Sequence, residues 1–347
     1  MSRHGLAVLL LCGVAVFLAG CGAAGSGVHV RVENLTVTPS TGPVMHVAVH
    51  NRSNRTFRGT VRVTPLDGWK LNRTRQGVTI PPEQALRVPF AIERGVDSPD
   101  NRYPVEVVVT GGDQRQARRQ EIVCASAPYF KPTIDGKVDD WADAIPVTFT
   151  TAGRRTTIHT YWSRRRFSLL VAVEEDALKR MPADWDGQEV DAVQFAVSPR
   201  DAVTPRRGSG KARRCEFLLL PARQAARCLA LVRPGDVLSR ATSTALDGRD
   251  VPGAQVAVVR EGGVTYYECA VPFQALPQIR PEPGREFCFS LLVHDPDGTG
   301  LRDWGEAAGL WDWQRNANAW FRWRGAQWPA SPPFDNKIEW GFCSSKH

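Results

Sequence analysis

Methionine and long hydrophobic runs are scarce in this sequence, which has three Met among 347 residues. No stretch of twelve or more residues repeats apolar side chains at helical spacing, which argues against a helical bundle. The mixture of 42% hydrophobic and 23% charged residues is that of a globular protein, so it excludes a disordered or fibrous chain. At about 100–200 residues per domain, the length predicts two domains.

Long blocks of like charge are also missing, although 44 Lys and Arg against 36 Asp and Glu give a formal net charge of +8. Arginine supplies 37 of the basic residues and lysine only seven, and they are scattered, with pairs such as Arg118–Arg119. A basic arm that binds nucleic acid needs a continuous basic block. Nucleic acid is therefore not an expected partner.

The sequence motifs of catalysis are missing too. The chain has no Gly-x-Ser-x-Gly turn, no His-Glu-x-x-His motif and no phosphate-cradling glycine loop. No two cysteines form a Cys-x-x-Cys pair, which argues against a zinc cage. Met45 and Met181 are the only methionines beyond the first residue, so we expect no haem ligated by Met and His. We expect a protein that is not an enzyme.

One apolar run is present near the N-terminus, at Leu6–Leu18. It is shorter than the roughly 20 residues of a membrane-spanning helix, so residues 1–20 are predicted to be a signal peptide. The run ends in Leu-Ala-Gly before Cys21, which resembles a bacterial lipobox, where the cysteine sulfur carries a lipid. Residues 21–27, rich in Gly and Ala, then form a flexible tether.

The lipobox implies an exported lipoprotein anchored in the cell envelope, at the outer membrane or the cell surface. An ordinary secretory signal with a chance cysteine is the alternative. Export places the remaining cysteines in an oxidising compartment and predicts disulfides, whose pairing the sequence leaves open. Cys215 and Cys228 are one candidate pair because they would close a short local loop. The six cysteines are Cys124, Cys215, Cys228, Cys269, Cys288 and Cys343.

Residues 28–125 alternate apolar and polar side chains with the period of a β-strand, for example in Val28–Val32 and Tyr103–Val109. Turn signals such as Asp67–Gly68 separate the runs. About seven short strands in a segment of this length predict an immunoglobulin-like β-sandwich. Its rhythm resembles the small accessory domains of bacterial sugar-active proteins. We interpret the domain as a spacer, with Trp69 in its core or at its edge.

Residues 128–347 follow a proline-bounded join and carry a second set of strand patterns. Together with the abundance of Trp and the lack of long helices, they predict an antiparallel β-sandwich or jelly roll, so the whole chain is expected to be all-β. The expected strands are 157–162, 167–173, 190–197, 215–220, 255–259, 264–271 and 286–293.

This second segment resembles the family 9 carbohydrate-binding modules through an ordered series of short motifs. Each motif is weak alone, and the ordered set is specific for the fold. The resemblance covers nearly all of residues 128–347 and implies a β-sandwich that binds sugar. The motifs, in order, are Ile134–Ala142, Thr160–Trp162, Phe167–Asp176, Trp185, Asp191–Phe195, Tyr266–Phe273 and Phe289–Asp295.

The related modules hold a terminal sugar between two Trp, because aromatic rings cover the flat C–H faces of a sugar. By position, Trp185 is the first plate. The second plate is Trp320, which follows an Asn-rich stretch, or Trp328. Several Trp in the C-terminal stretch must also belong to the core, because each buries a large apolar area.

Three polar residues are candidates for hydrogen bonds to sugar hydroxyls. Gln194 stands where the family has a sugar-bonding Glu, and Arg214 and Glu216 stand in place of a Gln-x-Arg strand. The resemblance therefore supports the fold of this segment more strongly than it supports sugar as the ligand. The resemblance also implies that Cys269 and Cys288 lie on neighbouring antiparallel strands.

Members of the family bind structural calcium, and two acidic turns here have the oxygen ligands that suit this hard cation. Asp295 and Asp297 form one candidate site, and Asp135, Asp139 and Asp140 form a second acidic turn. An Asp-Gly turn without a metal is the alternative interpretation.

The sequence thus predicts a membrane-anchored lipoprotein that holds carbohydrate, a glycan or polysaccharide, by aromatic stacking and without chemistry. The alternative is a scaffold lipoprotein that binds a protein partner and has kept the fold without the sugar site. The Trp cluster favours the first, and Gln194 with the missing Gln-x-Arg motif favours the second.

Overall fold

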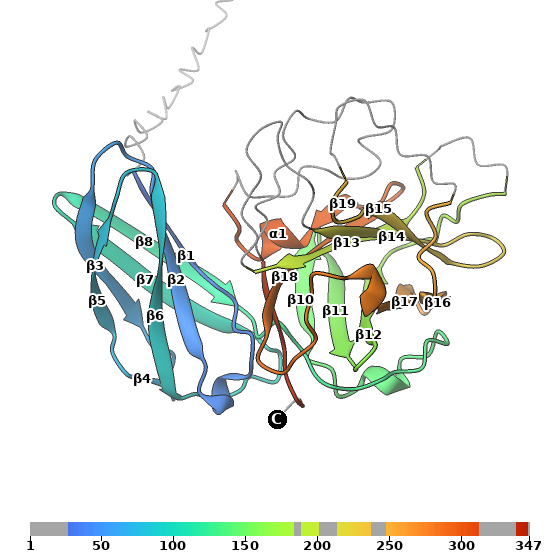
Figure 1. Ribbon diagram of the computed structural model, residues 1–347, viewed down its shortest axis with the longest axis horizontal. Coiled ribbons are helices and arrows are strands. Elements are labelled where there is room, and N and C mark those ends of the chain that lie inside the picture. Colours follow the sequence, from blue (N-terminus) through green and yellow to red (C-terminus); the bar gives the residue numbers. More distant parts are fainter. Residues whose placement is uncertain (1–26, 184–188, 201–213, 237–247, 312–337, 346–347) are drawn as a thin grey trace, which may run out of the picture.

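The computed structural model describes residues 27–183, 189–200, 214–236, 248–311 and 338–345. They form two β-sandwiches that lie side by side (Figure 1). In this part of the chain the only α-helix is the single turn α1 at Trp304–Ala307. No helix among the described residues is long and apolar enough to cross a membrane. The prediction of an all-β chain is confirmed.

The first sandwich consists of eight strands, one more than expected, and the 3-10 turn η1 at Pro39–Thr41. The strands are β1 Val28–Val32, β2 Val44–Asn51, β3 Phe57–Thr64, β4 Lys70–Leu71, β5 Arg75–Ile80, β6 Gln84–Arg94, β7 Tyr103–Gly111 and β8 Gln114–Ile122. One antiparallel sheet has the order β1-β2-β6-β4 and the other β5-β3-β7-β8.

Side-chain alternation builds the core of this first sandwich. In β7, Val105, Val107 and Val109 are buried, while Glu106 between them is exposed. Successive side chains of a strand point to opposite faces, so each sheet turns one apolar face toward the other. Trp69 is buried, as expected, and its Nε1 donates to the backbone carbonyl of Val96 at 3.2 Å.

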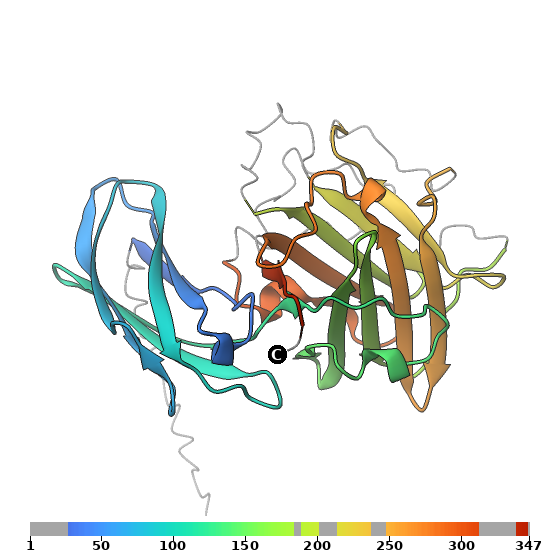
Figure 2. The same cartoon turned by 60° about the horizontal axis from the view of Figure 1, so that its bottom comes forward.

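The second sandwich also has two sheets (Figure 2). Its strands are β9 Ser126–Ala127, β10 Val147–Thr151, β11 Arg154–Trp162, β12 Arg166–Glu174, β13 Ala192–Pro199, β14 Cys215–Leu220, β15 Arg227–Val232, β16 Gln255–Glu261, β17 Val264–Pro272, β18 Glu286–Asp295, β19 Gly300–Asp303 and β20 Glu339–Phe342. A five-stranded sheet has the order β10-β11-β12-β17-β16. A seven-stranded sheet has the order β15-β14-β13-β18-β20-β9, with β19 also on β18. The 3-10 turns η2 and η3 span Asp139–Trp141 and Phe273–Ala275.

The segment that opens this sandwich packs on the five-stranded sheet through Trp141. The Trp141 ring stacks on Tyr161 with centroids 5.1 Å apart, and its Nε1 donates to Glu268 Oε1 at 2.7 Å. The other Glu268 oxygen accepts the backbone N–H of Gly136 at 2.5 Å, where φ of +85° suits glycine. The acidic Asp-Gly turn before Trp141 therefore has a structural role, because it covers a face of the sheet.

The expected disulfides are not present, since the six described cysteines are all free and buried. Cys269 and Cys288 were expected on neighbouring antiparallel strands. This prediction was wrong, because β17 and β18 belong to different sheets. Cys215 and Cys228 lie on neighbouring strands, but Cys228 is opposite Leu219 and not opposite Cys215. Cys215 is four residues along β14 from Leu219, an offset of about 13 Å, which is too far for a disulfide.

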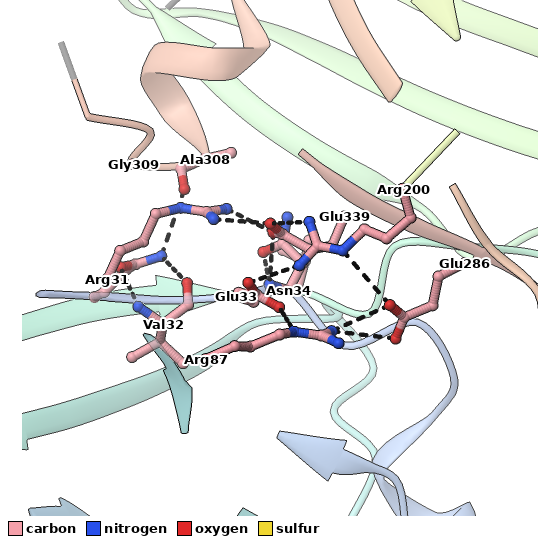
Figure 3. A network of polar contacts seen from close by, with 12 residues as sticks. Arg31, Val32, Glu33, Asn34, Arg87, Arg200, Glu286, Ala308, Gly309 and Glu339 are labelled. Atoms are coloured by element: carbon pink, nitrogen blue, oxygen red, sulfur yellow. Dashed lines mark hydrogen bonds and ion pairs between the residues drawn. The ribbon is translucent and has the colours of Figure 1, made fainter. Parts of the chain in front are cut away.

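A network of buried charges joins the two sandwiches (Figure 3). At its centre Arg31, at the end of the first sandwich's β1, makes a bidentate ion pair with Glu339 of β20 at 2.8 and 2.6 Å. Arg31 is 3% exposed and Glu339 is 1% exposed. Arg200 donates to the same carboxylate at 3.2 Å. Glu339 therefore accepts hydrogen bonds from guanidinium groups of both sandwiches.

A second carboxylate extends this network toward solvent. Glu33 accepts from Arg87 at 2.6 Å and from Arg200 at 2.7 Å. Arg87 also reaches Glu286 at 3.1 Å, across the same boundary. Because each carboxylate lies between arginines, the charges compensate each other at the contact between the sandwiches.

We predict that Glu339→Gln lowers the free energy of unfolding by about 3 kcal/mol, because it leaves Arg31 buried without its carboxylate. Equilibrium denaturation with urea measures this change. The control is Glu93→Gln, which breaks the exposed pair of Glu93 with Lys70 and is expected to cost under about 1 kcal/mol. Equal losses in the two variants would contradict the prediction.

The same pair predicts a pH dependence. Although burial opposes its charge, the arginines Arg31 and Arg200 lower the pKa of Glu339 to about 2 from the ordinary 4.5. A depressed pKa in the folded state gives stability that is complete above the unfolded value and is lost as the pH falls from 4.5 toward 2. The difference in unfolding free energy between wild type and Glu339→Gln should therefore shrink over this window. A difference in unfolding free energy that stays constant down to about pH 2 would contradict the predicted pH dependence.

Candidate functional site

The outer face of the seven-stranded sheet carries a cluster of polar side chains on β13, β14 and β18. In β13, Val193, Phe195 and Val197 belong to the core between the sheets. Strand alternation therefore directs Gln194 to the opposite, outer face. On the same reasoning Glu216 of β14, next to the core residue Phe217, also points outward.

Four buried side chains interact in this polar cluster, which consists of Gln194, Arg214, Glu216 and His294. The Gln194 amide donates to Glu216 Oε1, and its Oε1 lies 3.0 Å from His294 Nε2. Arg214 Nη2 donates to the other oxygen of Glu216 at 2.5 Å. The apolar neighbours Leu218 and Leu292 lie directly opposite Gln194 in the ladder, so the polar groups lie within an apolar surface.

Burial lowers the pKa of Arg214, while the adjacent Glu216 carboxylate opposes this shift. The pair therefore holds a guanidinium and a carboxylate as planar groups in fixed positions. The Gln194 amide adds a third planar group. Planar groups held in fixed positions are the kind of arrangement that can orient a polar ligand.

The structure brings together three of the predicted sugar-bonding residues, Gln194, Arg214 and Glu216. The sequence analysis missed His294 as the fourth member, although it ends the strand motif before Asp295. The remaining predicted residues, Trp185, Trp320, Trp328 and the lipidation site Cys21, lie outside the described residues.

The tryptophans that the structure describes are all buried, at 8% exposure or less. Some donate an indole N–H inside the fold, as Trp162 does to the Cys343 carbonyl at 2.8 Å and Trp340 to Thr160 at 2.9 Å. They are core residues and offer no plate to a ligand. The six are Trp69, Trp141, Trp162, Trp304, Trp311 and Trp340.

A second polar cluster lies beside the first, where β12 and β18 end and β13 begins. Glu175, Asp191 and Asp295 are all buried, and one carboxylate oxygen of each lies within 4.8 Å of the others. This acidic cluster comes from three separate segments of the chain. The hydroxyl of Tyr267 is also buried and close enough for the three carboxylates to raise its pKa in addition to the effect of burial.

Asp295 is the only member of the acidic cluster with a cationic partner among the described residues. It accepts from Arg302 at 2.6 Å and from the backbone and hydroxyl of Thr299 at 2.9 and 2.8 Å. Asp191 accepts the backbone N–H of Lys179 through one oxygen. Its other oxygen and the Tyr267 hydroxyl have no hydrogen-bond partner in the described part of the chain. The hydroxyl of Thr265 is close enough to the Glu175 carboxylate to lower its pKa, but burial outweighs this effect.

Burial raises the pKa of Glu175 and of Asp191 to about 7. A buried carboxylate that lacks an ion-pair partner is costly to ionise, which explains the raised pKa of these two groups. An all-oxygen set of this kind matches the preference of a hard divalent cation such as Ca²⁺.

The structure brings only one of the two predicted metal ligands into the acidic cluster. Asp295 lies in the acidic cluster, whereas Asp297 is exposed and is not one of the three grouped carboxylates. The sequence analysis missed Glu175 and Asp191 as candidate ligands. The sequence feature that could have indicated them is an acidic residue directly after or before an apolar strand. In the other acidic turn, Asp135 and Asp140 accept backbone N–H groups of Lys137 and Thr133 at 3.0 and 2.7 Å. These contacts are those of an Asp-Gly turn, in which side-chain oxygens accept nearby backbone N–H groups.

No protein-family model matches the chain, and no curated protein does. Among solved structures, the chain is similar to a family 9 carbohydrate-binding module from Caldicellulosiruptor kristjanssonii. In its complex with glucose, the likeness has 14% identity and a TM-score of 0.39 and covers 62% of this chain and 94% of that one. In the complex with cellotriose, the identity and TM-score are the same, and the coverage is 63% and 93%.

A further likeness is to a FixG-related protein from Vibrio parahaemolyticus, with 12% identity and a TM-score of 0.21, covering 28% of this chain and 95% of that one. At these identities and TM-scores, none of the similarities assigns a family or a ligand to this chain.

Proposed function

We propose that this chain is a non-catalytic carbohydrate-binding protein whose ligand contacts the outer face of β13, β14 and β18. The observation that supports this most directly is the polar cluster, which places an amide, a carboxylate and a guanidinium together on one sheet face. Sugar hydroxyls are bound by planar polar groups of this kind, and their mutual hydrogen bonds orient them before a ligand arrives.

The aromatic part of this proposal comes from the sequence. Trp185 precedes β13 by a few residues, and Trp320 and Trp328 precede β20. We propose that these residues supply the stacking plates and that a lipid on Cys21 anchors the exported chain to the cell envelope.

One observation favours the alternative, a scaffold that binds a protein partner. The four side chains of the polar cluster are each 5% exposed or less, and Gln194 contacts both Glu216 and His294 within the cluster. Side chains this deeply buried offer little surface to a sugar.

The test is a screen of the purified chain against an array of neutral glycans, followed by titration calorimetry with the best ligand. Trp185→Ala and Gln194→Met are each expected to raise Kd by about tenfold or more, through loss of a plate and of an amide. The matched control is Gln84→Met, an exposed Gln in the first sandwich, which should leave Kd unchanged.

Absence of binding across the array, with the chain folded by circular dichroism, would contradict the carbohydrate proposal and favour the scaffold. Binding that survives both Trp185→Ala and Gln194→Met would move the sugar site away from this face.

We also propose that Glu175, Asp191 and Asp295 hold a structural Ca²⁺. Among the described residues, Glu175 and Asp191 have no cation within ion-pair distance, and Arg302 neutralises only Asp295. The bound ion would supply the charge that this buried cluster lacks. Glu175, Asp191 and Asp295 would then connect the ends of β12 and β18 to the start of β13, next to the polar cluster.

Calcium at about 1 mM is expected to raise the thermal unfolding midpoint of the chain, and EDTA to reverse the effect. At a hundred times Kd, the stabilisation should reach about 2.7 kcal/mol. Glu175→Gln and Asp191→Asn should abolish the response. In EDTA the same variants should match or exceed the wild type in stability, because each removes a buried charge.

The matched control is Asp176→Asn, next to Glu175 in sequence but exposed and paired with Arg154. It should keep the full calcium response. An unchanged wild-type midpoint, or an equal response in Glu175→Gln, would contradict the calcium site.

A further inference from the structure

A basic cavity lies at the end of the second sandwich, where β11 turns into β12. Its volume is about 420 Å³. The lining residues come from the linker that enters this sandwich and from the β11–β12 turn. They are Tyr129, Lys131, Ser163, Arg164, Arg165 and Arg166. The cavity belongs to the five-stranded sheet and is therefore separate from the polar cluster on the seven-stranded sheet.

The backbone around this basic cavity is held firmly. Phe130 N–H donates to the Trp162 carbonyl at 2.9 Å, and Trp162 N–H donates to the Pro128 carbonyl at 3.0 Å. These bonds fix the linker against the end of β11. Within the turn, Ser163 N–H donates to the Arg166 carbonyl at 2.9 Å. The cavity is thus built on rigid elements, as preorganised binding requires.

The charge of the cavity is uncompensated. Four of the six lining residues are cationic, and none is acidic. Among the described residues, no carboxylate lies within ion-pair distance of Lys131, Arg164 or Arg165. By contrast, two other exposed arginines of this sheet, Arg154 and Arg155, pair with Asp176 and Glu174 at 2.6 Å. Clustered like charges repel one another, so a bound anion would relieve this cost.

An aromatic ring stands beside these cations. Tyr129 is 45% exposed, and an edge-to-face contact with Trp162, at 4.8 Å and 77°, fixes its orientation. A large aromatic residue that is fixed and half exposed offers a flat face to a ligand. The guanidinium forks of Arg164 and Arg165 match the geometry of a carboxylate.

We propose that this basic cavity binds a uronate residue of an acidic polysaccharide. The Tyr129 ring covers the apolar face of the sugar, and Arg164, Arg165 and Lys131 bind its carboxylate. A lone phosphate or a lipid headgroup has charge but no flat face for the ring to cover. The combination of ring and cations therefore favours a carboxylated sugar over a membrane surface.

The test compares two oligosaccharides by titration calorimetry on the purified chain, a short oligogalacturonate and the neutral oligogalactoside of the same length. We expect binding of the first and none, or at least about tenfold weaker binding, of the second. The double variant Arg164→Gln/Arg165→Gln should raise Kd for oligogalacturonate about tenfold or more. Tyr129→Leu should weaken binding at unchanged net charge.

The matched control is Arg154→Gln/Arg155→Gln, which makes the same change in net charge on the same sandwich. It should alter Kd by less than about twofold after salt screening at 0.15 M. Thermal unfolding checks that each variant is folded, and all four arginines lie at or near the surface.

Three outcomes would overturn the proposal. One is the absence of oligogalacturonate binding to the folded wild type. Another is an equal loss in the two double variants, which would show nonspecific attraction to the positive chain. The third is tighter association with vesicles containing about one quarter phosphatidylglycerol than with oligogalacturonate, which would identify a membrane surface. The neutral-glycan test of the polar cluster is unaffected by any of these results.

Discussion

The position of the two sandwiches relative to each other depends on one buried carboxylate, Glu339. It lies on β20, and guanidinium groups from both sandwiches converge on it, Arg31 from one and Arg200 from the other. A carboxylate this deeply buried is tolerated only with full compensation, so the two arginines and Glu339 must keep their geometry together. Because Arg200 directly follows β13, the contact between the sandwiches is continuous with the sheet that carries the polar cluster.

The polar cluster and the acidic cluster on the second sandwich also consist of buried charged groups. In the polar cluster, Glu216 is compensated by Arg214 and by the Gln194 amide. In the acidic cluster, Glu175 and Asp191 have no arginine or lysine within ion-pair distance among the described residues, and burial raises the pKa of each. In the first arrangement the carboxylate has both a cationic and an amide partner. In the second, two of the three buried carboxylates have no ion-pair partner among the described residues, which is the basis of the calcium proposal.

Much of the fold followed from local pattern. Alternation located β11 and β12 to within a few residues and predicted the all-β class, because strand periodicity is local. The same reasoning failed for the cysteines, since β17 and β18 follow each other in sequence but lie in different sheets. Gln194, Arg214 and Glu216 came from ordered motifs and were brought together. Glu175 and Asp191 were missed because their meaning depends on Asp295, more than a hundred positions away along the chain.

By itself, the sequence determined which residues form strands, which faces are apolar and that the chain starts with a short apolar run before Cys21. These properties depend on neighbours within a few residues. Only the tertiary structure decided which charges compensate each other. Arg31 and Glu339 are 308 positions apart, and nothing near either residue in the chain indicates its partner. The physical reason is that a buried charge is stabilised by whatever the fold places beside it, and that depends on sheet order and packing.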